Sequence, residues 1–162
     1  MIDPIQPSSI IEIANYPEDL KTTELLPHCV HQNCYYVCAN ELYYIDLQEG
    51  TPTWRKVSAL PFLQRNGQSM TSTPSGIVFF GGQDKNMVSY YNDLWIYSTQ
   101  NWEYVTCDIP VRAFHAAACD QNGNLIICGG FIDSQHSLHD IYLINLKTQV
   151  VTELNIPFLP KV

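Results

Sequence analysis

The stretch GIVFFGG at residues 76–82 decides the fold, because it returns as NLIICGG at residues 124–130. Each copy is an apolar run of strand length that ends on two consecutive glycines. Paired glycines at a strand end mark a place where backbones converge or where φ must be positive. One such run would indicate a buried strand. Two runs with matching flanks predict a repeated structural unit.

The flanks of the two runs repeat in the same order. Arg65 and Arg112 precede the first glycine of each pair by 16 and 17 residues. A polar loop follows each pair and leads to an acidic and aromatic strand, which begins at Asp93 in one copy and at Asp140 in the other, a step of 47 residues. A further strand then closes each unit. Four strands per unit with a period near 50 residues is typical of a β-propeller blade.

An earlier, degenerate copy of the unit lies upstream, where residues 34–38, 41–46 and 53–57 align with the later strands. Its second strand lacks the glycine pair and turns at once through Ala39 and Asn40. We therefore expect this first blade to have almost no loop at the place where its siblings have about ten residues.

The linker between units is repeated as well. LPFLQR at residues 60–65, IPVR at 109–112 and IPFLPK at 156–161 share one pattern. The expected division is an arm at 1–27 with a candidate strand from Ile10 to Ile13, blades at 28–62, 63–110 and 111–157, and the start of an absent further blade at 158–162.

These features together resemble the kelch repeat over residues 28–162, with Val151 standing where a closing tryptophan is expected. The resemblance implies an all-β fold, a partial kelch-type β-propeller of about three four-stranded antiparallel blades. It also implies that the glycine pairs lie on the innermost strands and that Trp54 and Trp102 pack between adjacent blades. The expected structural repeat positions are Gly81, Gly82, Gly129, Gly130, Trp54, Trp95, Trp102 and Tyr142.

Composition limits the classes of partner. Hydrophobic residues make up 46% of the chain and charged residues 15%, and the ten Tyr favour strands. A net charge of −8 with scattered Lys and Arg argues against nucleic acid. No stretch approaches the roughly 20 apolar residues of a membrane helix, and the start lacks a secretory pattern. We expect a cytoplasmic or nuclear protein with reduced core cysteines, disulfides being the lesser alternative.

Candidate chemistry is sparse. The richest set of potential metal ligands lies at residues 28–38, but its Cys spacings of five and four fall within a predicted strand and differ from the tight Cys-x-x-Cys loops of zinc sites. His115 and Gln68 share one repeat position, so we expect a structural hydrogen bond and no catalytic role. No phosphate loop, dinucleotide fingerprint or nucleophile elbow is present. We expect no metal, no cofactor and no enzymatic activity.

The number of blades suggests association. Closed propellers have about four to eight blades, and an arc of about three would expose two apolar blade faces. Two copies would make a ring of about six blades, and the candidate strand from Ile10 to Ile13 could complete a blade of the other copy. The alternatives are that another subunit supplies the remaining blades, or that the chain is a fragment of a longer propeller.

The loops after the glycine pairs, residues 83–92 and 131–139, are the preferred binding candidates, since rigid scaffolds carry binding residues on loops. In kelch substrate receptors of cullin ligases, an arginine that enters the innermost strand can grip acidic peptides. By resemblance Arg65 and Arg112 match that position, with Lys161 a weaker third. The alternative is that these arginines cap the blade edge, and the charge of −8 argues against an acidic ligand.

We therefore predict a non-enzymatic protein-protein interaction module that binds a protein or peptide and forms a homodimer. A structural subunit of a larger complex is the alternative, and a kelch-like enzyme is the third reading. The candidate binding residues are Arg65, Arg112, Lys85, Tyr90, Tyr91, Phe131, His136 and His139.

Overall fold

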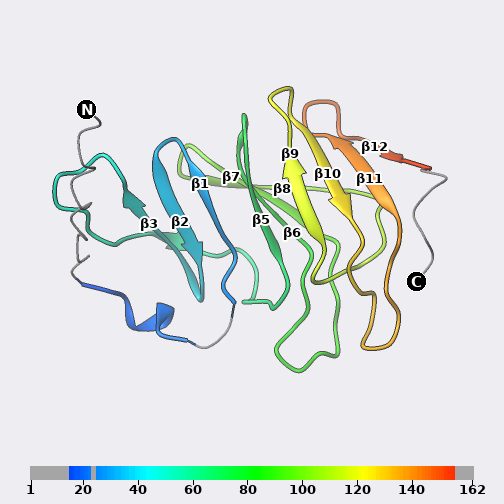
Figure 1. Cartoon of the computed structure of the whole chain (residues 1–162), viewed down its shortest axis with the longest axis horizontal. Coiled ribbons are helices and arrows are strands. Elements are labelled where there is room, and N and C mark those ends of the chain that lie inside the picture. Colours follow the sequence, from blue (N-terminus) through cyan, green and yellow to red (C-terminus); the bar gives the residue numbers. More distant parts are fainter. Residues whose placement is uncertain (1–14, 23–24, 156–162) are drawn as a thin grey trace, which may run out of the picture.

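The chain folds into three antiparallel sheets that stand side by side (Figure 1). The computed structural model describes residues 15–22 and 25–155. Within these residues each sheet has four strands in chain order, preceded by a 3₁₀ turn at Glu18–Leu20. The strands are β1 His28–His31, β2 Cys34–Cys38, β3 Glu41–Asp46, β4 Arg55–Ala59, β5 Ser69–Thr73, β6 Gly76–Phe80, β7 Leu94–Ser98, β8 Asn101–Val105, β9 Ala116–Cys119, β10 Asn124–Cys128, β11 Ile141–Asn145 and β12 Val150–Glu153.

Each sheet is one blade, which confirms the predicted partial propeller of three four-stranded blades. The first blade is irregular in the way its sequence predicts, because β2 passes to β3 through Ala39 and Asn40 alone. A further irregularity in that blade shifts the pairing of β3 with β4 between Leu42 and Tyr43. No helix in the described part of the chain is long and apolar enough to cross a membrane.

The innermost strands are the first strands of the blades, and this corrects one prediction. β5 lies against both β1 and β9, so these three strands line the axis of the arc. The glycine pairs instead follow β6 and β10, the second strands. The apolar sequence of β6 suggested that it is the innermost strand, and β6 is indeed buried along its whole length. It is buried for a different reason: as the second strand of its blade, it is covered on both faces and along both edges.

The glycine pairs are nevertheless places of close backbone approach. All four glycines have positive φ, from 62° to 96°. A Cβ on Gly81 would lie 2.6 Å from the carbonyl oxygen of Arg112, at the start of the next blade. A Cβ on Gly130 would lie equally close, 2.6 Å, to the carbonyl oxygen of Ala113. At Gly81 and Gly130 a side chain is therefore excluded both by conformation and by space.

Two apolar cores join the blades. The core between the second and third blades contains Val78 and Phe80 of β6 and Leu125 and Ile127 of β10. The core between the first and second blades gathers Leu42, Phe79 and several aromatic rings. Trp102 lies at this boundary, where its indole N–H donates to Ser58 Oγ of the first blade at 2.9 Å.

Trp54 does not occupy the equivalent boundary. It packs against Tyr16 and Tyr35 on the outer side of the first blade, with ring centroids 5.6 and 6.3 Å away. The prediction that it lies between adjacent blades is therefore wrong, because no blade precedes the first one in the described chain and the segment at residues 15–22 takes that place. Leu20 is only 4% exposed and packs with Val37 of β2. The candidate strand from Ile10 to Ile13 and residues 158–162 lie outside the described residues.

Candidate functional site

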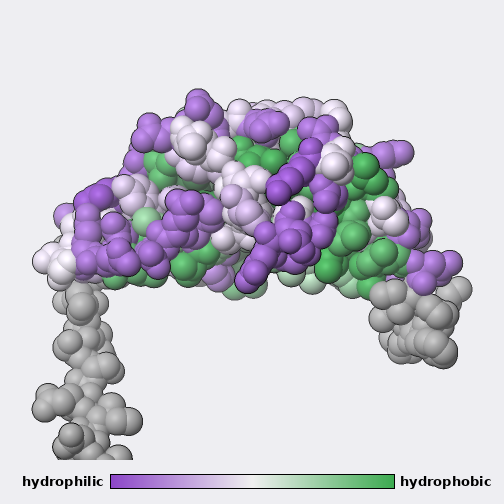
Figure 2. Space-filling model, turned by 90° about the horizontal axis from the view of Figure 1, so that it is seen from above, coloured by the Kyte–Doolittle hydropathy of each residue, from purple (hydrophilic) through white to green (hydrophobic). Residues whose placement is uncertain are grey.

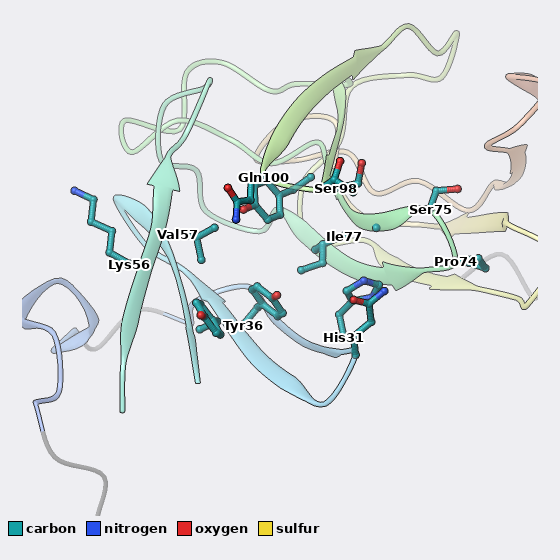
Figure 3. Close-up of a pocket in the computed structure, with 14 residues that line it drawn as sticks. His31, Tyr36, Lys56, Val57, Pro74, Ser75, Ile77, Ser98 and Gln100 are labelled. Atoms are coloured by element: carbon teal, nitrogen blue, oxygen red, sulfur yellow. The ribbon is translucent and has the colours of Figure 1, made fainter. Parts of the chain in front are cut away.

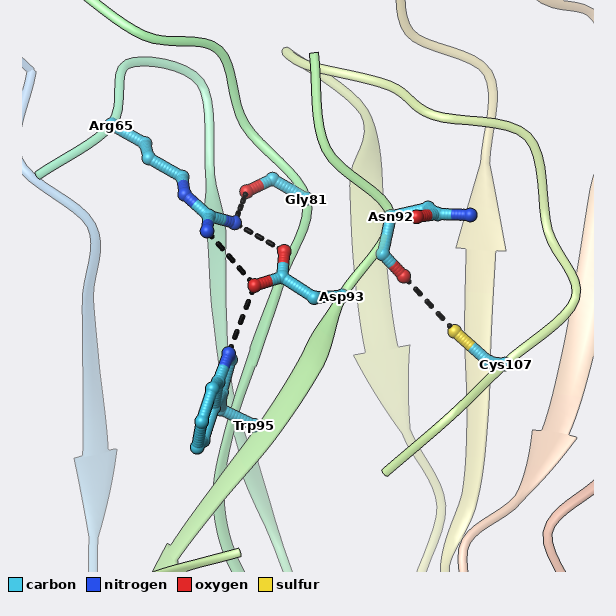
Figure 4. A network of polar contacts seen from close by, with 6 residues as sticks. All are labelled: Arg65, Gly81, Asn92, Asp93, Trp95 and Cys107. Atoms are coloured by element: carbon cyan, nitrogen blue, oxygen red, sulfur yellow. Dashed lines mark hydrogen bonds and ion pairs between the residues drawn. The ribbon is translucent and has the colours of Figure 1, made fainter. Parts of the chain in front are cut away.

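The guanidinium group of Arg65 is held inside the second blade (Figure 4). It forms a two-pronged ion pair with Asp93, with Nη2 donating to Oδ2 at 2.8 Å and Nη1 paired with Oδ1. Nη1 also donates to the carbonyl oxygen of Gly81 at 3.2 Å. The centroid of the Tyr91 ring lies 3.8 Å from the guanidinium carbon Cζ, and Asp93 in addition accepts from the Trp95 indole at 2.9 Å.

Arg112 repeats this arrangement in the third blade and is fully buried, at 0% exposure. Its Nη1 and Nη2 donate to Asp140 at 2.6 and 3.0 Å, and Nη1 also donates to the carbonyl oxygen of Gly129 at 3.0 Å. Tyr142 supplies the neighbouring ring. Each arginine thus ties the start of a blade to the glycine pair and to the third strand. This geometry favours blade-edge capping over the gripping of an acidic peptide.

The pairing of arginine with aspartate was visible in the sequence, although the prediction did not use it. Asp93 follows Arg65 by 28 residues, and Asp140 follows Arg112 by the same 28 residues. An identical spacing of opposite charges in two repeat units indicates that the two positions face each other. The rings that lie over the guanidinium groups could not be found in this way.

The loop at residues 83–92 is ordered by an aspartate near its start. The Asp84 carboxylate accepts hydrogen bonds from the backbone N–H groups of Val88 and Ser89, at 2.8 and 3.2 Å. This turn leaves Lys85, Met87 and Val88 exposed. Of the other predicted binding residues, Tyr90 is half-buried, whereas Tyr91 is committed to Arg65.

The loop at residues 131–139 uses the same device. Asp133 Oδ1 accepts from the backbone N–H groups of Gln135 and His136, both at 2.8 Å, and these bonds, with the His136 ring, lower the pKa of Asp133. The predicted residues Phe131, His136 and His139 are all exposed. Both loops lie at the same end of the sheets (Figure 1).

His115 contacts a hydroxyl group in a way that superficially suggests catalysis. Its Nε2 lies 2.8 Å from Ser69 Oγ, but within the described residues Nδ1 has no partner that could orient the ring. Burial and the neighbouring Arg112 lower the pKa of His115 to about 4, well below that of a base poised for neutral pH. The contact is therefore an inter-blade hydrogen bond, although Gln68, at the same repeat position, makes no equivalent bond.

The cysteines are free thiols in the structure. Burial raises the pKa of Cys29 and of Cys38 to about 12, which makes these thiols unreactive. In the described ranges, no group of three or more His, Cys, Asp and Glu side chains is arranged to hold a metal ion.

A groove of about 560 Å³ runs between the first and second blades (Figure 3). Tyr36 and Tyr44 stack there with centroids 5.6 Å apart, and His31 Nδ1 is hydrogen-bonded to Ser72 Oγ at 2.9 Å. Ser98, the last residue of β7, and Gln100, in the turn to β8, add polar groups. No pattern in the sequence indicates this groove, because three hairpin turns that are distant in sequence contribute to it.

The outer face of the third blade is apolar and open. Paired residues of an antiparallel sheet share a face, and the face turned away from the second blade therefore carries Ala116, Ala118, Ile126, Cys128, Ile141 and Leu143, with the polar residues Asn124, Asn145 and Thr152 at its margin. Ile126 at its centre is 40% exposed. Figure 2 shows apolar residues gathered at this end of the molecule.

The chain is similar to several known proteins. A family model described as "KLHDC2/KLHL20/DRC7 Kelch-repeats domain" matches residues 32–160. The chain is 38% identical over 86 residues to acyl-CoA-binding domain-containing protein 6 of Oryza sativa subsp. japonica, and 32% identical over 90 residues to dynein regulatory complex subunit 7 of Chlamydomonas reinhardtii. These stretches cover 49% and 52% of this chain but only 13% and 8% of those proteins.

One similar solved structure is described as "Structure of YjhT". It superposes with a TM-score of 0.71 at 16% identity, over 82% of this chain and 50% of that one. At this identity the likeness shows the fold alone. The chain thus corresponds to about half of that structure.

Proposed function

Because the chain belongs to the kelch-repeat family described as KLHDC2/KLHL20/DRC7, we propose that it is a non-enzymatic protein-interaction module that pairs with a second copy through the outer face of its third blade. The observation that carries this proposal is the contrast between the two ends of the arc. The first blade is covered on its outer side by residues 15–22 of the same chain. The third blade presents bare apolar side chains.

The apolar face of the third blade has the character of an interaction surface. In a propeller, such a face packs against the next blade, as the face of the second blade does here. Contiguous exposed apolar surface on a folded domain marks an interaction site. A second copy offers the same face, so two molecules can cover each other by two-fold symmetric contact.

A closed ring of two copies is less well supported than this pairing. Ring closure requires the third blade of one copy to meet the first blade of the other. Leu20 and Tyr16 occupy that first blade, where the Tyr43 hydroxyl also donates to Asp19 at 2.9 Å. These contacts would have to be given up before the ring could close.

The loop end of the sheets is proposed to bind a protein or peptide partner. Met87, Val88 and Phe131 are exposed there on loops that their aspartates hold in fixed shape. Exposed apolar and aromatic side chains on ordered loops are typical of interfaces. One relative is named as a subunit of a complex, so the second candidate is a structural subunit whose open face is covered by a different chain.

Size-exclusion chromatography with light scattering tests the proposal. The wild-type chain is expected at twice the chain mass, and Ile126→Lys at the chain mass, because the substitution places a charge in the face. Val30→Lys is the matched control, since Val30 is exposed on the first blade and should leave the mass of the dimer unchanged. A monomeric wild-type chain would overturn the proposal, as would an Ile126→Lys variant that still dimerises.

A further inference from the structure

A second cavity, of about 280 Å³, opens where the three innermost strands begin. We name it the mouth pocket; it is lined by residues 25–28, Gly67, Gln68, Met70, Phe114 and His115. Its three parts lead into β1, β5 and β9, so every blade contributes to it. The volume lies just below the roughly 300–1,000 Å³ of small-molecule sites. It therefore suits a single peptide side chain better than a whole small ligand.

The mouth pocket contains an unpaired buried donor. Gln68 is only 8% exposed, yet its amide nitrogen Nε2 has no hydrogen-bond partner among residues 15–22 and 25–155. A Cβ on Gly82 would lie 3.0 Å from Gln68 Cβ, so glycine at position 82 leaves room for this side chain. His115 also lines the pocket, and within the described part of the chain its Nδ1 has no partner either. Buried polar groups are normally satisfied, and an exception needs an explanation.

Phe114 is held in an unfavourable conformation at the rim. Its φ is 56°, a region that bulky residues avoid, and its side chain is 56% exposed. The same repeat position of the preceding blade is Gly67, with φ 65°. The fold thus accepts glycine at this position. A strained aromatic residue that is also exposed points to a role in binding.

We propose that the mouth pocket takes one apolar side chain of an extended, uncharged peptide, whose main-chain carbonyl accepts a hydrogen bond from Gln68 Nε2. This inference rests on the proposed function as an interaction module and names the class of its ligand. Leu25, Pro27, Met70 and the Phe114 ring form the apolar wall.

The charges near the pocket argue against an acidic ligand. The arginines that could hold a carboxylate, Arg65 and Arg112, are buried and paired with Asp93 and Asp140. His115 is neutral at pH 7, because burial and Arg112 lower its pKa to about 4. The net charge of −8 further repels acidic peptides.

Selection from a displayed library of random linear dodecapeptides on the purified full chain tests the inference. The enriched peptides are expected to share one apolar residue flanked by uncharged residues. A fluorescein-labelled enriched peptide is then titrated by fluorescence anisotropy. Phe114→Gly and Gln68→Leu should each raise its Kd by about tenfold or more.

Tyr104→Ser is the matched control, because Tyr104 is an exposed aromatic residue of the fourth strand β8 that does not line the pocket. It should leave the Kd unchanged. Phe114→Gly should not lower the thermal unfolding temperature, since glycine suits the conformation, and Gln68→Leu provides an independent reading. Acidic consensus peptides, no enriched peptide, or peptides that bind both variants like wild type would overturn the inference. The light-scattering test of the proposed function uses a different face, so the two failures are distinguishable.

Discussion

Removal of Asp140 should destabilise the fold strongly, because it leaves the Arg112 guanidinium buried without a counter-charge. Arg112 is 0% exposed, and Asp140 accepts hydrogen bonds from both of its terminal nitrogens. Breaking one partner of a buried pair typically costs about 3–5 kcal/mol. We therefore expect Asp140→Ala to lower the free energy of unfolding by about that amount. The measurement is urea-induced unfolding followed by tryptophan fluorescence.

Two further variants make this prediction specific. The double substitution Arg112→Met with Asp140→Leu should be much less destabilising than Asp140→Ala, because it removes the buried charge together with its partner. Arg55→Ala is the matched control, since Arg55 pairs with Glu49 at the surface, where such pairs contribute about 0–1 kcal/mol. A loss for Asp140→Ala no greater than that for Arg55→Ala would refute the reasoning that the arginines are buried structural caps.

Three further predictions concern the glycine pairs, His115 and Trp102. Gly82→Ala should destabilise the fold by more than Gly123→Ala in chemical denaturation, because both have positive φ but only Gly82 lacks space, with Arg65 Cβ 2.9 Å from the added methyl group. The free energy of unfolding should fall by up to about 3 kcal/mol from pH 6.5 to pH 4, because the pKa of His115 is lowered to about 4 in the folded state and the unfolded state therefore binds the proton first. Equilibrium unfolding at several pH values should show a weaker dependence of stability on pH for His115→Gln than for the wild type. Trp102→Phe should cost at least about 1 kcal/mol in thermal or urea unfolding through the lost hydrogen bond to Ser58, and an unchanged stability would mean that the indole does not join the two blades.

The repeat pattern was sufficient to predict the blades. Apolar runs, glycine pairs and linkers recur at a fixed step, and periodicity of this kind reports directly on a repeated unit. The absence of a glycine pair after β2 also predicted the short turn at Ala39 and Asn40. The family match over residues 32–160 agrees with this reading.

Features that break the repeat could not be predicted. The segment at residues 15–22 covers the first blade with Tyr16 and Leu20, and nothing in its own pattern indicates what it contacts. The mouth pocket depends on φ at Phe114, which a sequence does not reveal. The innermost position of β5 and β9 was also missed, because burial along a strand does not distinguish the first strand from the second.

The role of the arginines illustrates the limit of reading one residue at a time. Arg65 and Arg112 match a ligand-binding position of related receptors by sequence alone. In the structure each meets an aspartate 28 residues later in the chain, beneath an aromatic ring. Pairs of equally spaced charges in a repeat should therefore be tested against each other before they are assigned to a ligand.

The central claim is that the outer face of the third blade is covered in solution, and alkylation of Cys128 tests it most directly. Cys128 lies on that face, partly exposed, next to Ala116 and Ile141. Its alkylation rate, followed by peptide mass spectrometry, should fall as the protein concentration rises, while the rate at Cys34 of the first blade stays constant. The Ile126→Lys variant should show no such fall. A rate at Cys128 that does not change with concentration, at concentrations where the wild-type chain is proposed to pair, would contradict the account.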